Sequence, residues 1–239
     1  MKRYIEQEQV EIAPHPYIYR VVHRIMEGDC KMDHGPLLIT GGGFLADKYP
    51  VTNKMFYDFI QESGYEPKDK NGYLLHWENG CYKDGQENWP VVHVSLEDAR
   101  AYAKFYGKKL PSDQQWQYMA AGPDNKTWPW GNELDYTKCN VYSDSLEAVD
   151  TYPEGASCFG VMDLCGNAWE MTDECIYDGG HYFTLLRGGC YYKAPHYWHV
   201  ESGAAPNFSH LKVHLLGGAM NRNATVGFRC IQEVSYDKA

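Results

Sequence analysis

Histidines are concentrated in one stretch of the sequence. Four of the 10 lie between residues 196 and 214, as His196-x-x-His199 and His210-x-x-x-His214. Neutral imidazole is a ligand of iron, copper and zinc, and two histidines at positions i and i+4 of a helical turn can share one ion. The segment that starts at Asn207 is compatible with such a turn. The alternative, which we favour, is a polar surface loop, because no acidic ligand accompanies the four histidines.

A cysteine lies just upstream of this stretch. Cys190 is a candidate nucleophile or single metal ligand, and Lys193 and His196 are close enough in sequence to favour its thiolate. We favour a second interpretation, in which Cys190 is a small buried apolar residue. The eight cysteines of the chain include no CxxC pair and no zinc-finger spacing, so most are expected to be free thiols in a reducing compartment.

Three capped helices are predicted in the first half of the chain. Each begins at a Ser or Thr whose side chain can accept a hydrogen bond from the first turn, and each ends at a glycine. The predicted helices run from Thr52 to Gly64, from Ser95 to Gly107 and from Ser112 to Gly122. Apolar runs at 17–22 and 37–40 predict strands. The second half has short apolar pieces separated by Gly, Asn, Asp and Pro, which is typical of short strands joined by long loops, so the predicted class is α+β.

Composition excludes some classes of partner. The formal charge of -10 and the absence of a basic stripe argue against nucleic acid. No apolar stretch approaches the length of a membrane span or of a signal-peptide core, so we expect no membrane contact and a cytoplasmic location. At 239 residues with 44% hydrophobic residues, the chain is long enough for one large domain with its own core. The oligomeric state is left open.

Seven ordered motifs cover roughly residues 37 to 231. They are DKYPVTN at 47–53, WPVVHVS at 89–95, GKKLPSDQQWQY at 107–118, WPWG at 128–131, GVMDLCGNAWEMT at 160–172, LRGG at 186–189 and GFRC at 227–230. Together they resemble the formylglycine-generating-enzyme, or sulfatase-modifying-factor, family. The resemblance implies a C-type-lectin-like α+β fold with little regular secondary structure, short helices and a loop-rich antiparallel sheet. We expect that domain at 37–239 and an N-terminal extension at 1–36 that packs on it.

The resemblance also implies two calcium sites. Calcium takes six to eight oxygen ligands, which loops rich in carboxylates and free carbonyls can supply. The first site is matched by Asn140, Val141, Asp144 and Leu146. The second is matched by Asp163, by the carbonyls of Cys165 and Gly166, and by Glu170. The competing interpretation is that these are solvated turn residues. It applies more strongly to the first site, because the loop of that site is short for the family.

The family's active members bind copper(I) through two cysteines that follow the Arg-Gly-Gly block. Here those two positions hold Lys193 and Trp198, and the preceding serine position holds Cys190. An ammonium and an indole cannot replace two thiolates as ligands of a cuprous ion. The standard oxidation is therefore not expected of this chain.

Two functions from different classes remain. We favour a binding protein, because a cleft rich in aromatic side chains and poor in titratable groups suits recognition of a peptide, glycan or small molecule. The expected ligand-binding residues are Trp169, Tyr191, Tyr192, Lys193, Tyr197 and Trp198. The alternative is a divergent oxidoreductase that uses iron or copper, with Cys190 and the histidines of the 190–214 loop at its active site.

Overall fold

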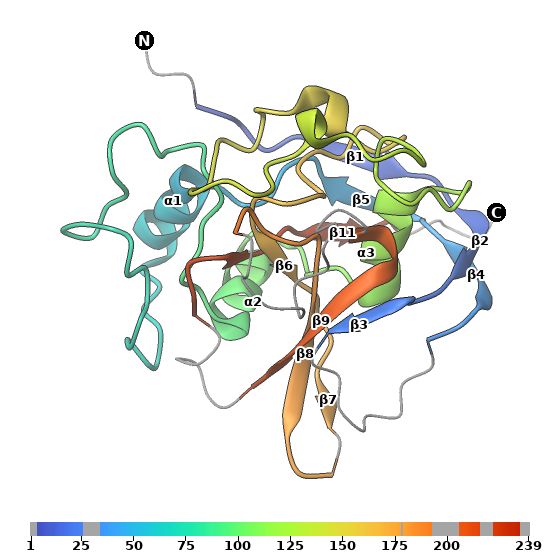
Figure 1. Ribbon diagram of the computed structural model, residues 1–239. Coiled ribbons are helices and arrows are strands. Elements are labelled where there is room, and N and C mark those ends of the chain that lie inside the picture. The colour runs from blue at the N-terminus through green and yellow to red at the C-terminus, as the bar shows by residue number, and fades with distance from the viewer. Residues whose placement is uncertain (1–3, 26–33, 178, 193–205, 216–221, 235–239) are drawn as a thin grey trace.

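The computed structural model describes residues 4–25, 34–177, 179–192, 206–215 and 222–234. As expected, the fold is α+β, with short helices and short, mostly antiparallel strands (Figure 1). The helices are α1 (Asn53–Ser63), α2 (Leu96–Phe105) and α3 (Asp113–Ala121), and the 3-10 turns are Tyr136–Lys138, Pro153–Gly155 and Pro206–Phe208. The strands are β1 (Gln9–Ile12), β2 (His15–Tyr19), β3 (His23–Ile25), β4 (Leu37–Gly41), β5 (Phe44–Asp47), β6 (Trp169–Met171), β7 (Ile176–Tyr177), β8 (Tyr182–Arg187), β9 (Ser209–His214), β10 (Val226–Gly227) and β11 (Ile231–Glu233).

The three helices begin at the predicted caps. Thr52 accepts a hydrogen bond from the backbone N–H of Met55, and Ser95 and Ser112 each form a reciprocal capping box with the residue three positions later. These bonds satisfy amides that would otherwise have no partner in the first turn. Gly64 ends α1 in the left-handed conformation at φ 66°. The local signals in the sequence therefore located all three helices.

The strands form three sheets. In the largest, the order is β10-β6-β8-β9-β3, with β7 paired to β8. The second has the order β1-β5-β11, and the third pairs β2 with β4. Segment 1–36, which we expected to pack on the domain as an extension, supplies β1, β2 and β3 and so contributes a strand to every sheet. Its strand pairing makes it part of the sheets themselves.

Aromatic side chains fill the interior. In the core beside α1 and α2, Phe56 stacks on Tyr102 with ring centroids 5.9 Å apart, and Phe228 contacts both edge-on. In the second core, Trp116 of α3 is fully buried against residues of β1, β5 and β11. Packing thus accounts for much of the high aromatic content.

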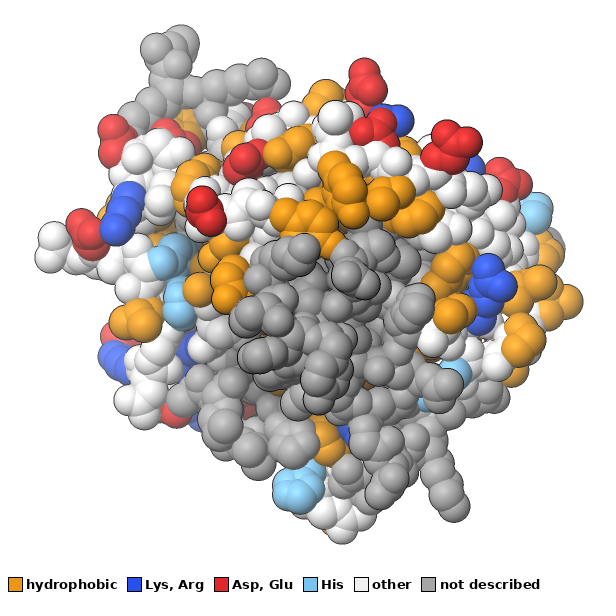
Figure 2. Space-filling model, viewed as in Figure 1, with side chains coloured by type: hydrophobic (Ala, Val, Ile, Leu, Met, Phe, Trp, Pro, Cys, Tyr) orange, Lys and Arg blue, Asp and Glu red, His pale blue; other side chains and the backbone are white. Residues whose placement is uncertain are grey.

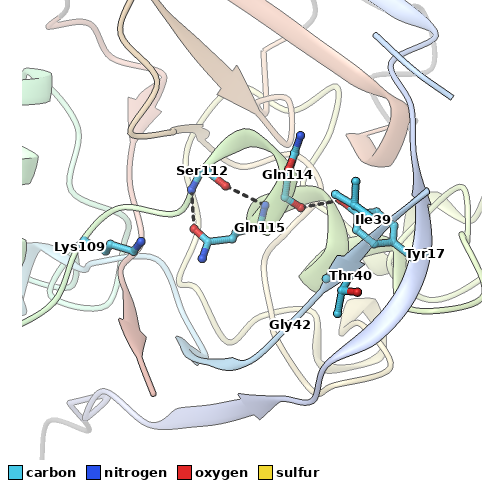
Figure 3. A pocket seen from close by; sticks show the side chains of 9 residues that line it. Tyr17, Ile39, Thr40, Gly42, Lys109, Ser112, Gln114 and Gln115 are labelled. Carbon is cyan, nitrogen blue, oxygen red and sulfur yellow. Dashed lines mark hydrogen bonds between the residues drawn. The ribbon is translucent and has the colours of Figure 1, made fainter. Parts of the chain in front are cut away.

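A cavity of about 340 Å³ lies at the start of α3, between the β2–β4 sheet and the loop that precedes the helix (Figure 3). Ser112 and Gln115 face each other there through the two bonds of the capping box, and the Tyr17 hydroxyl donates to the Gln114 carbonyl at 2.9 Å. Lys109, on the opposite wall, forms an ion pair with Glu233. The polar groups at the start of α3 are therefore already paired, and the bond from Tyr17 to Gln114 ties this end of the helix to β2.

The surface carries scattered charge. On the face shown in Figure 2, the Lys and Arg side chains of the described residues stand singly, and acidic side chains lie along the upper edge. This face lacks, among the described residues, the basic stripe that a phosphate backbone requires. No helix in the described part of the chain is long and apolar enough to cross a bilayer.

Candidate functional site

The expected cleft begins where β6 and β8 lie side by side. Glu170 of β6 pairs with Arg187 at the end of β8, which places Trp169 close to the turn that follows β8. That turn consists of Gly188 and the next glycine, both left-handed, at φ 92° and 81°. A Cβ at position 188 would lie 3.3 Å from the Leu164 carbonyl oxygen, so the LRGG motif lets the chain pass close to the 160–172 loop on its way to Cys190.

Cys190 is buried, with 4% of its surface exposed. Its Sγ lies 3.7 Å from the carbonyl oxygen of Tyr192, to which the thiol donates. Burial raises the pKa of the thiol to about 11, and hydrogen bonds with Tyr192, Trp169 and Thr225 offset only part of that effect. At neutral pH the side chain is therefore a protonated thiol rather than a nucleophilic thiolate.

Three of the six expected ligand-binding residues lie in the described part of the chain. Tyr191 is tied to two loops, because its amide donates to the Asn167 carbonyl at 3.0 Å and its carbonyl accepts from the Ser143 amide at 3.1 Å. Tyr192 is half exposed, at 50%, and Trp169 is buried at 8%. The other residues expected in this wall, Lys193, Tyr197 and Trp198, lie outside the described residues.

The described part of the histidine stretch, residues 206–214, forms neither the helical turn that the metal-site interpretation requires nor, at the buried His210, the polar surface loop that we favoured. Residues Pro206–Phe208 make a 3-10 turn, after which β9 carries both His210 and His214. Along a strand, residues four apart are separated by about 13 Å, too far for two imidazoles to share an ion. The pairing of β9 with β8 and β3 overrides the local preference of the segment. His196 and His199 lie outside the described residues.

His210 is buried, and its ring meets the ring of His34 edge-on at 5.6 Å between centroids. Nearby, burial raises the pKa of the Asp113 carboxyl group, but the ion pair with Arg187 and, to a smaller extent, His210 lower that pKa below its usual value. Within the described residues, no three His, Cys, Asp or Glu side chains gather closely enough to hold a metal ion.

A second histidine pair was missed by the sequence analysis. The rings of His76 and His93 stack with centroids 5.4 Å apart, and burial lowers the pKa of His76 to about 4. His93 belongs to the WPVVHVS motif and adopts φ 56°, an uncommon conformation for a residue other than glycine. Its amide donates to the carbonyl of Asn223 at 2.9 Å. Only the position of His93 inside a family motif could have drawn attention to it.

The loop of the first expected calcium site is closed by its own hydrogen bonds. Asn140 donates through Nδ2 to the Ser145 carbonyl at 3.0 Å and accepts through Oδ1 from the Ser143 hydroxyl at 2.5 Å. Asp144 is exposed, and Leu146 is buried. The Asn140 amide therefore serves as an internal clasp, and its oxygen, which accepts one hydrogen bond from Ser143, keeps a second lone pair.

Asn167 joins this loop to the 160–172 loop. Its Oδ1 accepts from Asn140 Nδ2 at 3.1 Å and from the Glu147 amide at 3.0 Å. Its Nδ2 donates to the Glu147 carbonyl at 3.1 Å and to Asp163 Oδ2 at 2.8 Å. The two loops that the family resemblance assigns to calcium are therefore one hydrogen-bonded unit, which also includes Val141 through the close packing of its side chain on Gly166.

The second expected site retains three suitable donors. The pKa of Asp163 is raised to about 8, mainly by burial; the Asn167 hydrogen bond and the charge of Arg229 lower it, and the charges of Glu170 and Glu147 raise it. Among the described residues, no backbone amide is found to donate to the Gly166 carbonyl oxygen, whereas the parallel bridge of Asn140 with Gly166 directs the Asn140 amide toward the Cys165 carbonyl oxygen. A desolvated carboxylate among other acids is stabilised by a bound cation, so this set fits calcium.

Glu170, the fourth expected donor, has other partners. It accepts from Arg229 Nε at 2.6 Å, from Arg229 Nη2 at 2.5 Å and from Trp116 Nε1 at 2.7 Å. The carboxylate and the guanidinium are both buried, with side-chain exposures of 1% and 0%. We therefore take Glu170 as the partner of Arg229, because a bidentate ion pair leaves its oxygens little capacity for a divalent cation.

The chain is similar in sequence to known proteins. Residues 25–234 match the family model described as "Sulfatase-modifying factor enzyme 1-like domain". The chain is 27% identical over 273 residues to a protein named serine/threonine-protein kinase Pkn1 from Chlamydia trachomatis, and it spans 41% of that protein's length. It is 24% identical to the mouse protein named inactive C-alpha-formylglycine-generating enzyme 2, with 84% of this chain and 78% of the mouse protein aligned.

Solved structures agree on the fold. The structure of PvdO from Pseudomonas aeruginosa superposes with a TM-score of 0.66 at 17% identity, over 95% of this chain and 94% of that one. At this level of identity the similarity establishes the architecture alone.

Proposed function

Because this chain belongs to the family of sulfatase-modifying factor enzyme 1-like domains, we propose that it is a calcium-stabilised binding protein of that family and not a formylglycine-generating oxidase. The observation that carries the proposal is the state of Cys190. It is the one cysteine at the family's cleft segment, and its buried thiol has a pKa of about 11. Copper(I) chemistry needs thiolates, and the two family positions for them hold Lys193 and Trp198.

The nature of the cleft supports recognition. Tyr192 offers a half-exposed ring in the segment that follows the LRGG motif, and side chains of this type provide large contact area with little loss of conformational entropy. The proposed ligand is a peptide, glycan or small molecule. The mouse relative named as an inactive enzyme supports the idea that the family's fold persists without the oxidation.

Tyr192 gives the direct test of ligand binding. Wild-type protein is screened on a glycan microarray and a peptide library, and Tyr192→Ala is expected to weaken the best hit by about tenfold or more, since an anchoring aromatic contributes at least ~1.4 kcal/mol. Tyr177→Ala is the matched control, because Tyr177 is similarly exposed, at 58%, but lies on β7. Equal losses in both variants, or no hit in either library, would count against the proposal.

Calcium is the second part of the proposal, with Asp163 and the carbonyls of Cys165 and Gly166 as the donors. These three oxygen donors would hold the ion, and its positive charge would neutralise the acidic side chains around Asp163. Elemental analysis of purified protein is expected to show calcium without stoichiometric iron, copper or zinc. Removing calcium with EGTA should lower the Tm by about 5–10 °C, the effect of losing a ligand present at ~100 times its Kd.

Variants of two aspartates locate the calcium effect. Asp163→Asn should abolish the response to EGTA, and Asp144→Asn, at an exposed position in the other loop, should preserve it. A Tm that is insensitive to EGTA in the wild type would remove calcium from the proposal. A stoichiometric iron or copper ion that is lost on replacing His196 and His199 would favour the alternative function, a divergent oxidoreductase.

A further inference from the structure

Two cysteines that are distant in the sequence meet inside the protein. Cys139 and Cys165 are both buried, at 4% and 3% exposure, and they share a small apolar cluster with Trp128, Trp130 and Val141. They are the two buried members of this cluster, so their side chains pack against each other.

The backbones beside these cysteines are paired. Asn140 and Gly166 form an isolated parallel bridge, and the Asn167 amide donates to the Asn140 carbonyl at 2.8 Å. Paired backbones lie about 4.8 Å apart, and Cys139 and Cys165 each directly precede one of the bridged residues. Disulfides join Cα atoms that are ~4.4–6.8 Å apart, so little movement separates this arrangement from a covalent bond.

We propose that Cys139 and Cys165 form a reversible disulfide that joins the 139–146 loop to the 160–172 loop, with a low-molecular-weight disulfide such as oxidised glutathione as the oxidant. The structure places the pair as free thiols, which is the reduced form of the site. Neither side chain takes part in the proposed ligand cleft, and the proposed calcium site uses the backbone carbonyl of Cys165 and not its thiol.

The reaction proceeds by two exchanges. The Cys139 sulfur attacks one sulfur of glutathione disulfide, breaks the S–S bond and expels one glutathione thiolate. The Cys165 sulfur then attacks Cys139 of the mixed disulfide and expels the second glutathione thiolate. The two cysteine protons pass to the two released thiolates. The protein loses two electrons and two protons, and one glutathione disulfide becomes two glutathione thiols.

The surroundings predict slow but persistent oxidation. Both thiols are buried, at 4% and 3% exposure, so the oxidant reaches them slowly. Once formed, the disulfide lies among Trp128, Trp130 and Val141, where reducing agents have little access. Because the cross-link closes a loop in the unfolded chain, the oxidised protein should unfold at a Tm about 5–10 °C higher.

The test uses the whole chain in glutathione redox buffers at pH 8.5. After equilibration the protein is unfolded in iodoacetamide, digested and analysed by mass spectrometry. We expect a peptide pair joined between Cys139 and Cys165, two hydrogens lighter than the reduced peptides, and the higher Tm in the same samples. Cys158 and Cys175 are the internal controls, because both are exposed and should acquire only glutathione.

Variants separate the cross-link from general oxidation. Cys158→Ser/Cys175→Ser should keep the full rise in Tm, and Cys139→Ser should lose it; Cys165→Ser provides the same comparison should Cys139→Ser fold poorly. The proposal is overturned if Cys139 and Cys165 are both recovered fully alkylated while Cys158 and Cys175 carry glutathione. It is also overturned if the rise in Tm survives in Cys139→Ser.

Discussion

Replacing Arg229 by methionine should lower the free energy of unfolding by about 3–5 kcal/mol, because the change leaves the Glu170 carboxylate buried without its counter-ion. The guanidinium donates twice to Glu170 and once to the Met162 carbonyl at 2.8 Å. Among the described residues, Trp116 would then remain as the only donor to the carboxylate. Urea unfolding followed by tryptophan fluorescence measures the loss.

A second substitution distinguishes charge from packing. Adding Glu170→Gln to Arg229→Met should recover at least ~1 kcal/mol, since the buried charge is then gone. Arg100→Met is the control, because Arg100 pairs with Asp173 at the surface, with exposures of 42% and 41%, and should cost no more than ~1 kcal/mol. If Arg229→Met and Arg100→Met were equally mild, the buried pair would not be a main contributor to stability.

Gly166→Ala is the other change with a large expected effect. Gly166 has φ 79°, and a Cβ there would lie 2.2 Å from the Asn140 carbonyl oxygen and 2.8 Å from the Val141 side chain. The backbone would have to move, which breaks the bridge between the two loops. Strain in the left-handed conformation and overpacking together predict a loss of about 3–5 kcal/mol in the free energy of unfolding.

Gly160→Ala isolates the effect of conformation. Gly160 has φ 84°, close to that of Gly166, but a Cβ there meets nothing within 4 Å. The expected loss is therefore about 1–2 kcal/mol. Parallel denaturant titrations of the two variants give the difference directly. A loss at position 166 no larger than that at position 160 would show that the loops do not depend on their close approach.

The helices and the fold were predictable because their signals are local or numerous. Ser95 and Ser112 act on amides within three residues, so the sequence alone locates the start of a helix. The fold followed from seven motifs in a fixed order, and no single one of them was needed. Both kinds of signal can be recognised in the sequence without knowing which strands pair.

Parts of the candidate site were not predictable because they depend on distant partners. Asn207 suggested a helical turn, but β8 and β3 flank the following segment and make it a strand. Glu170 matched a calcium ligand by motif, yet its carboxylate is bound by Arg229, which is 59 positions away. Nothing in the spacing of Cys139 and Cys165 indicates that they touch. Each of these contacts is decided by the tertiary fold.

The position of β5 bears on how the chain folds during synthesis. Ala46 of β5 pairs with Val10 of β1 on one side and with Ile231 of β11 on the other (Figure 1). The middle strand of this sheet therefore emerges from the ribosome long before its second partner, and its edge stays unpaired until residue 231 has been made. Such distant pairing slows folding. Until β11 is made, it also leaves the unpaired edge of β5 free to pair with strands of other chains. We expect the domain to complete its folding only after translation has passed β11, with chaperones covering that edge until then.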